Sequence, residues 1–532
     1  MRIGIISVFT DYHRRGAHHR NVLQPQVGPL IAALLPRSVE VEVVNDAWTD
    51  PDWNRDYDLL FISCLHSDFD RARQISHYWR RRGAKTVLGG TLAGTYPKLC
   101  KPFFDAIVIG DPETTVPRVL EDFSRRALQP FYFSGPYCAE AVPVPRFDLV
   151  AHEQVLPLSF EVTRGCPFTC DFCALTAVGT RHHTRPVEMV IRDIQEGQRM
   201  LRGIAPWYKR KIAMFYDNNL GGNLGYLRQL CDALVPMGIY WGVCVTFNVI
   251  CDGELLDRMA RAGCRGVFVG LETFNPRALE SMRKFQNVLS KIRRAIAQCH
   301  RRGIIVASGI MLSPSNDDAA YIAAIPRHLQ DCGLHVPTYV CFETPFPGTP
   351  HFKKAASAAQ PAFLPNALLR DFDAYTLVSR TVHETPQDFV AAYRRLHQQV
   401  YSKRFKFGKL LRDARTFLSR GMLLPVAFDA YELLTEPEQL HPDRTFIAGT
   451  DITPPEANGV PLLEDDFSSE AERDWIVGPW AVTDERGRPL SFWLDSAQVF
   501  FDKGRSIAQP ERVWGAGRPS PFSPRVVMGT AR

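Results

Sequence analysis

The chain has 532 residues, of which 45% are hydrophobic and 23% are charged, and its formal net charge is +6. This length allows two or three domains with substantial cores, and the composition excludes collagen-like, coiled-coil and low-complexity architectures. Because the basic residues are scattered and accompany no recognisable nucleic-acid-binding motif, we expect no nucleic-acid partner.

The first part of the chain alternates short apolar strand patterns with helical patterns. Strands are predicted at residues 3–8, 39–44, 59–63, 85–88 and 106–109, and helices at 28–35, 69–82 and 115–123. Such alternation predicts an α/β fold with a parallel sheet covered on both faces, of the doubly wound, Rossmann-like kind. A proline-rich segment at 141–146 then suggests that a first domain ends near residue 145.

A second region, residues 152–350, repeats the alternation with a longer period. Its six predicted strands lie at residues 159–162, 212–216, 241–247, 266–269, 304–311 and 338–343. Six strand–helix units fit a partial (β/α)6 barrel, in which chemistry is expected at the C-terminal ends of the strands. Residues 351–430 predict a mainly helical extension, and residues 431–532, rich in proline, glycine and acidic residues, predict an irregular tail of unknown fold.

Three cysteines follow the first strand of the second region. Cys166, Cys170 and Cys173 have the spacing C-x3-C-x2-C, which can hold three irons of a four-iron cluster, whereas an ordinary cluster of this type takes four cysteines. The missing ligand leaves one iron open to bind and reduce another molecule. A zinc site with His182 or His183 as fourth ligand is the alternative, but zinc ligands are usually spaced C-x2–4-C and then H-x3–5-H.

This spacing, with the aromatic Phe172 directly before the third cysteine, closely resembles the signature of the radical S-adenosylmethionine (SAM) enzymes. The resemblance implies that the open iron of a [4Fe–4S] cluster chelates SAM. It also implies that an electron from the cluster cleaves SAM to a 5′-deoxyadenosyl radical, and that Phe172 packs on the adenine of SAM.

The first domain resembles the cobalamin-binding domain of a subfamily of these enzymes. Seven residues at the ends of three predicted strands follow the order of the cobalamin signature: Asp11, His13 and Gly16, then Ser63 and Leu65, then Gly89 and Gly90. The resemblance implies that His13 coordinates cobalt or lies near it, with Asp11 bonded to its other nitrogen. It also implies that the serine and the glycines line the tunnel for the nucleotide tail. Many related enzymes bind cobalamin without a protein ligand, so a ligand role for His13 stays open.

Further resemblances to the subfamily lie along the barrel. The segments around Asp217 and Glu272 resemble segments near SAM, which implies SAM contacts, although each could be a structural strand-end acid bonded to backbone. Residues 344–350 resemble the turn that closes the barrel, where a side chain at Gly348 would obstruct the turn. No catalytic side chain is assigned; Cys341, as a methyl carrier, and Asp217 are the candidates.

The two regions together resemble the cobalamin-dependent radical SAM methyltransferases. The resemblance implies C-methylation of an unactivated carbon in a small molecule or lipid, such as a hopanoid-type lipid or a secondary metabolite. The cofactors would be a [4Fe–4S] cluster, SAM and cobalamin. A cyclase or rearrangement enzyme with the same cofactors is one alternative, and a cobalamin- or cluster-binding regulator without turnover is another.

The cluster needs an electron donor, such as a flavodoxin or a ferredoxin. No stretch approaches the ~18 apolar residues that span a bilayer, and the chain begins in a strand pattern without a signal-like segment. Thirteen cysteines in such a chain predict free thiols and a reducing, cytoplasmic location.

Overall fold

The computed structural model describes residues 1–10, 14–15, 26–49, 51–152, 156–178, 182–357, 362–364, 367, 369–434, 439–442 and 444–450, with four short strands further on. Those strands form two small antiparallel pairs, β18 (Glu456–Ala457) with β19 (Val460–Pro461) and β20 (Ala481–Thr483) with β21 (Pro489–Ser491). Within the described ranges, every helix is too short or too polar to cross a bilayer.

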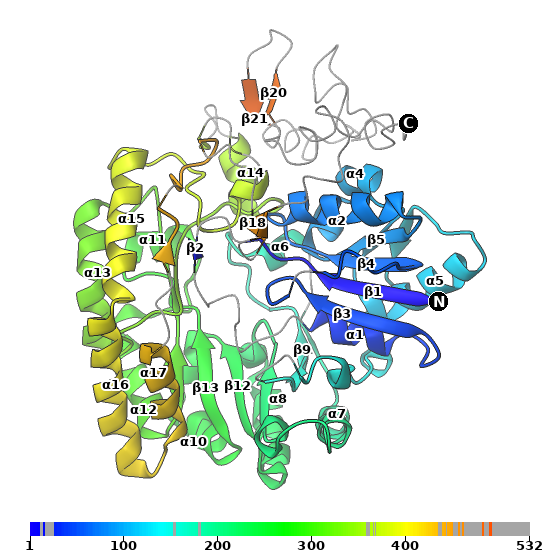
Figure 1. Ribbon diagram of the computed structural model, residues 1–532. Coiled ribbons are helices and arrows are strands. Elements are labelled where there is room, and N and C mark those ends of the chain that lie inside the picture. Colours follow the sequence, from blue (N-terminus) through cyan, green and yellow to red (C-terminus); the bar gives the residue numbers. More distant parts are fainter. Residues whose placement is uncertain are drawn as a thin grey trace.

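The first sheet has six parallel strands in the order β3-β1-β4-β5-β6-β7 (Figure 1). The strands are β1 (Arg2–Ser7), β3 (Glu40–Asn45), β4 (Leu59–Ser63), β5 (Lys85–Gly89), β6 (Ala106–Ile109) and β7 (Phe131–Phe133). Counted along the chain this order is 2-1-3-4-5-6, the flavodoxin type of doubly wound sheet and not the Rossmann order. In such sheets the ligand crevice lies at the carboxyl ends of the strands, where the winding reverses between β1 and β4.

Helices cover both faces of this sheet because its strands are apolar on both sides. Ile3 and Ile5 pack with α1 (Val27–Ala33) and α5 (Pro112–Ser124). The neighbouring Ile6 belongs to the core shared with α2 (Phe69–Arg81) on the opposite face. This alternation has the period of two expected for a strand, and it confirms the predicted α/β fold with a parallel sheet.

The second sheet carries the strands of the predicted barrel. β8 (Ser159–Phe160), β11 (Ile212–Phe215), β12 (Tyr240–Val245), β13 (Cys264–Val269) and β14 (Ile305–Ala307) are parallel neighbours, and β15 (Gly309–Leu312) pairs in parallel with β16 (Tyr339–Phe342). A bridge between Glu272 and Ile310 joins the two sets. The predicted strand 304–311 is thus two strands, interrupted at Ser308, whose hydroxyl accepts a hydrogen bond from the Leu271 amide (3.2 Å).

Amphipathic helices alternate with these strands, as the sequence predicted. They are α7 (Val187–Met200), α8 (Leu224–Leu234), α10 (Gly253–Arg261), α12 (Ile292–Arg301) and α13 (Ala319–Cys332). Side-chain caps fix where three of them begin, because Asn223, Asp252 and Asp318 accept hydrogen bonds from first-turn amides of α8, α10 and α13.

The helical extension packs on the outside of the barrel. α15 (Pro386–Val400) lies along α13, followed by α16 (Lys403–Phe417) and α17 (Leu424–Leu434) (Figure 1). Tyr393 of α15 is fully buried, with its ring 4.7 Å from that of Phe342 on β16. Tyr393 therefore packs α15 against the strands of the second region. The predicted domain boundaries remain predictions.

Candidate active site

The cysteine loop leaves β9 (Thr163–Arg164) through a glycine turn. Gly165 has φ +82°, a left-handed conformation that a side chain would strain. Cys166, Cys170 and Cys173 follow, and α6 (Ala174–Val178) begins directly after them. No disulfide joins any of the thirteen cysteines, all of which lie in the described part of the chain.

Polar groups from elsewhere in the barrel surround the cysteine sulfurs. The Asn219 amide donates to Cys166 Sγ (3.6 Å), and the Gln286 amide donates to Cys170 Sγ (3.7 Å). Burial raises the pKa of the Cys170 and Cys173 thiols, whereas the nearby Lys284 ammonium acts in the opposite direction. N–H donors and a buried cation stabilise thiolates. This donor set therefore fits an anionic iron–sulfur cluster.

The histidines considered as zinc ligands lie beside this loop. His183 belongs to β10 (His183–Thr184), which pairs antiparallel with β9, and its ring stacks on Tyr137 with centroids 4.8 Å apart. Over the described ranges, no group of three or more His, Cys, Asp or Glu side chains is arranged to hold a single metal ion.

A buried ion pair adjoins the cysteine loop. Lys284 Nζ lies 2.7 Å from Glu272 Oε1 and 5.5 Å from the centroid of the Phe172 ring. Burial alone would lower the pKa of Lys284, but the Glu272 carboxylate raises it, so the ammonium stays charged. The structure thus brings Glu272 and Phe172 together through Lys284. The sequence analysis missed this lysine, because a single lysine in the loop after α11 (Pro276–Ser281) carries no distinguishing pattern.

Glu272 is held in a strained conformation. Its φ is +68°, a left-handed value uncommon outside glycine and found mainly where surrounding structure enforces it. A Cβ at Gly270 would lie 2.3 Å from Glu272 Oε1 and 2.8 Å from Lys284 Nζ. Gly270 therefore leaves the space in which this ion pair forms.

Asp217 lies two residues beyond the end of β11 and is almost completely buried. Its Oδ1 accepts hydrogen bonds from the amides of Val162 (3.2 Å) and Thr163, which begin the cysteine loop. Burial raises the pKa of Asp217 to about 7. The carboxyl thus has the backbone contacts considered as its structural alternative, while Oδ2 has no hydrogen-bond partner among the described residues.

The last two strands present an apolar inner wall. Met311 of β15 is opposite Cys341 of β16, and the two form a buried cluster against which Phe172, Tyr339 and other residues pack. Cys341, a candidate methyl carrier, thus belongs to the buried cluster against which Phe172 packs.

The carboxyl edge of the first sheet holds four of the seven predicted cobalamin residues. Ser63 is paired with Gly89, and Leu65, just beyond, is 57% exposed. Gly90 has φ +95°, and a Cβ there would lie 2.8 Å from the Cys64 carbonyl oxygen, whereas a Cβ at Gly89 would meet only open space. We call the carboxyl edge at Ser63, Leu65, Gly89 and Gly90 the glycine edge. The space beside Gly89, which a side chain would fill, fits a bulky planar ligand such as a corrin.

The segment with the other three cobalamin residues lies outside the described residues. These are Asp11, His13 and Gly16. The chain entering it is anchored at Thr10, whose amide and hydroxyl donate to Asp68 Oδ1 at 3.0 and 2.7 Å.

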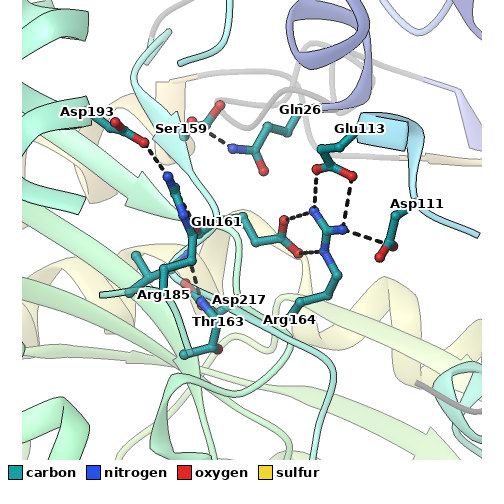
Figure 2. A network of polar contacts seen from close by, with 11 residues as sticks. Gln26, Asp111, Glu113, Ser159, Glu161, Thr163, Arg164, Arg185, Asp193 and Asp217 are labelled. Atoms are coloured by element: carbon teal, nitrogen blue, oxygen red, sulfur yellow. Dashed lines mark hydrogen bonds and ion pairs between the residues drawn. The ribbon is translucent and has the colours of Figure 1, made fainter. Parts of the chain in front are cut away.

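The helices that follow the glycine edge and the cysteine loop, α3 (Thr91–Thr95) and α6, pack against each other. Gly348, in the turn that follows β16, has φ +86°, and a Cβ on it would lie 2.7 Å from Thr95 and 2.9 Å from Ala177. Thr95 is the last residue of α3, which begins directly after Gly90, and Ala177 lies in α6, which begins directly after Cys173. Arg164, just before the cysteines, bonds to Glu113 of α5 (Figure 2). The two predicted cofactor sites are therefore adjacent.

Known proteins are similar to this chain in sequence and in fold. A model of the Radical SAM superfamily matches residues 160–324. The chain is 25% identical over 338 residues to bacteriochlorophyllide d C-8(2)-methyltransferase of Chlorobaculum tepidum, which covers 60% of this chain and 73% of that protein. It is 26% identical over 322 residues to hopanoid C-2 methylase of Rhodopseudomonas palustris, covering 56% of this chain and 57% of the relative.

Among solved structures, the chain resembles the radical SAM methyltransferase TsrM from Kitasatospora setae, solved with cobalamin and a [4Fe–4S] cluster bound. The TM-score is 0.53 with 15% sequence identity, and the match covers 75% of this chain and 88% of TsrM. At this identity the similarity concerns the fold.

Proposed function

Since this chain is a radical SAM enzyme, we propose that it C-methylates an unactivated carbon with a [4Fe–4S] cluster, SAM and cobalamin. The observation that carries the proposal is the contact of α3, which follows the glycine edge of the first sheet, with α6, which follows the cysteine loop, at the turn that contains Gly348. A cluster held by the cysteine loop and a corrin held at the glycine edge would then lie close to each other.

The three cysteines would hold three irons of the cluster. When bound, the cluster and SAM supply a radical able to abstract hydrogen from an unactivated C–H bond, and the corrin supplies a methyl group. The amides of Asn219 and Gln286 would donate to ligand sulfurs, as they donate to Cys166 and Cys170 here.

The residues around the cluster would orient SAM. Phe172 offers an aromatic face for the adenine, and Glu272 offers a carboxylate held in place by Lys284. Asp217 has one oxygen fixed by backbone amides and the other without a partner among the described residues, which leaves an acceptor for a donor group of SAM or substrate.

The first sheet would hold the corrin. Ser63, Leu65, Gly89 and Gly90 lie at its carboxyl edge, where doubly wound sheets bind ligands. A ligand role for His13, together with Asp11 and Gly16 of the same sequence motif, remains part of the proposal.

The inner wall indicates an apolar substrate. Met311, Cys341 and Tyr339 contribute to a buried cluster beside Phe172, and such surfaces bind apolar ring systems. The relatives are named for a bacteriochlorophyllide and a hopanoid, both largely apolar polycyclic molecules. A pigment or polycyclic lipid is therefore the proposed substrate class, acted on with a flavodoxin or ferredoxin as electron donor in the cytoplasm.

The test is anaerobic turnover of the reconstituted full chain with SAM, dithionite and either bacteriochlorophyllide d or a hopanoid. We expect 5′-deoxyadenosine and S-adenosylhomocysteine together, a product heavier by one methyl group, and loss of all three with Cys170→Ala. Deoxyadenosine with a rearranged, unmethylated product would instead indicate a cyclase. A wild-type protein that forms no deoxyadenosine would overturn the proposal in favour of a regulator.

A further inference from the structure

Arg164 is the centre of an ion-pair network between the two sheets (Figure 2). Its Nη2 lies 2.8 Å from Glu113 Oε1 and 2.6 Å from Glu161 Oε2. Nη1 lies 2.8 Å from Asp111 Oδ1 and 3.2 Å from Glu113 Oε2, and Nε lies 2.9 Å from Glu161 Oε1. Every nitrogen of the guanidinium therefore contacts a carboxylate.

Two of these carboxylates belong to the first sheet. Asp111 ends the turn from β6 to α5 and Glu113 lies in the first turn of α5, on the same carboxyl edge as Gly89 of the neighbouring β5. Gly110, before them, has φ +93°, and a Cβ there would lie 2.1 Å from Ser134 Oγ. The turn is thus fixed by a residue that only glycine can replace without strain, and the two carboxylates have a defined position.

The other end of the network belongs to the cysteine loop. Arg164 precedes Cys166 by two residues, with only Gly165 between them. Its guanidinium lies 5.0 Å from the Tyr137 ring centroid. The neighbouring buried pair of Arg185 and Asp193 (2.5 Å) holds the start of the loop, because Arg185 also donates to the Glu161 carbonyl oxygen (3.1 Å).

The buried network requires an arginine at position 164. The side chain of Arg164 is 12% exposed and that of Glu113 is 4% exposed, so salt and water screen their attraction less than at a surface pair. The planar guanidinium presents forked N–H groups that match two carboxylates at once, whereas a lysine ammonium is a point charge on a flexible stem. A lysine at 164 would keep the charge and lose the fixed geometry.

We infer that Arg164 is a positioning residue that locks the cysteine loop to the β6–α5 turn and thereby sets the spacing of cluster and corrin. The inference rests on the proposed function, which requires both cofactors. Transfer between groups held by two lobes depends on near-contact geometry, and a misplacement of ~1 Å can cost ~100-fold in rate. Arg164 directly precedes the cysteine loop, and its guanidinium is paired with Asp111 and Glu113 at the carboxyl edge of the first sheet. It can therefore fix the distance between these two parts of the chain.

The test compares Arg164→Lys and Glu113→Gln with Arg302→Lys in the anaerobically reconstituted full chain. Arg302 is a matched control, because it makes a forked pair with Asp257 (2.7 and 3.0 Å) within the barrel alone. One readout is amide hydrogen exchange. The other is the spin-relaxation enhancement of cob(II)alamin by the reduced cluster, which falls steeply as the distance between the two centres grows.

We expect the Arg164 and Glu113 variants to keep their content of cluster and corrin. In both variants the backbone amides of the non-proline residues in 110–113 and 165–170 should exchange severalfold faster than in the wild type. The relaxation enhancement should fall in both and remain unchanged in Arg302→Lys. Full cofactor content with wild-type exchange and relaxation in Arg164→Lys would overturn the inference. If the wild type retains no corrin, the proposed function fails, and with it the cofactor spacing. Hydrogen exchange would still decide whether Arg164 joins the two loops.

Discussion

At the scale of single residues, the cysteines were predictable and their surroundings were not. A C-x3-C-x2-C spacing is local, so one segment of sequence contains the whole signal. Lys284 lies more than one hundred residues beyond Cys173 and reaches the site only because the barrel folds. Its role becomes visible from its 2.7 Å contact with Glu272.

Replacing Lys284 should make the cluster harder to reduce. Reduction adds negative charge, which a buried cation nearby stabilises, so Lys284→Gln should lower the midpoint potential. The shift should be on the order of tens of millivolts, because charges several ångströms apart interact by at most a few kcal/mol at protein dielectric values. A redox titration followed by electron paramagnetic resonance measures it. Lys291→Gln, at an exposed position of the same lobe, should change nothing, and an unchanged potential in Lys284→Gln would contradict the argument.

Glu343 is a second residue that the sequence did not single out. It follows β16 on the same side as Cys341, and its Oε2 accepts a hydrogen bond from the Ser313 hydroxyl (2.6 Å). Burial raises the pKa of Glu343 to about 7. The folded protein therefore holds the proton more tightly than the unfolded chain between the ordinary glutamate pKa and about 7, and stability falls as pH rises through that window.

Glu343→Gln should remove this contribution to the pH dependence. Relative to the wild type, the variant should gain up to about 3 kcal/mol of unfolding free energy as pH rises from 5 to 8, because each pKa unit corresponds to roughly 1.4 kcal/mol. Urea unfolding across this pH range measures the difference. Glu254→Gln, at an exposed glutamate, should keep the wild-type slope, and an equal slope for Glu343→Gln would show that the buried carboxyl does not titrate in this range.

At the scale of elements, periodicity located the strands and helices but not the contacts that interrupt or order them. The predicted 59–63 and 106–109 strands match β4 and β6 residue for residue. The break at Ser308 depends on a hydrogen bond from Leu271, which lies just beyond the end of β13. The flavodoxin-type order depends on which side of β1 the strand β3 joins. Neither leaves a local pattern.

The turn after β16 was predicted from its sequence, and its packing explains the glycine. Gly348→Ala should destabilise the protein by about 1–3 kcal/mol, because it combines a left-handed φ with overlap against Thr95 and Ala177. Gly421→Ala isolates the first part, since Gly421 has φ +70° with nothing within 4 Å of its Cβ position. Denaturant midpoints should therefore fall further for Gly348→Ala. Equal shifts would mean that Thr95 of α3 and Ala177 of α6 can move away from the added methyl group without loss of unfolding free energy.

At the scale of the whole molecule, the sequence predicted two cofactor-binding lobes, residues 1–145 and 152–350, but not which residues join them. The Arg164 network joins residues 51 positions apart, and Arg164 differs in no local feature from the many scattered arginines of the chain. The arrangement matters because one lobe would generate a radical and the other would supply a methyl group. Each activity should then be separable by a change confined to one lobe.

Gly89→Leu tests this separation at the glycine edge. A Cβ at Gly89 meets open space, so leucine should be tolerated by the fold while it occupies the place proposed for the corrin. We expect the variant to lose cobalamin on desalting, to keep its iron, and to form deoxyadenosine without S-adenosylhomocysteine. Absorbance, iron analysis and chromatography of the products measure these three quantities.

Gly135→Leu is the matched control for that change. Gly135 lies in the same lobe, after β7, and its Cβ position is equally open, but it does not lie on the carboxyl edge between β4 and β5. This variant should keep cobalamin, iron and both products of SAM. If Gly89→Leu also keeps its cobalamin, the corrin does not bind at the glycine edge. The contact between α3, the turn at Gly348 and α6 would then serve folding alone, because adjacency of two sites has catalytic meaning only when both are filled.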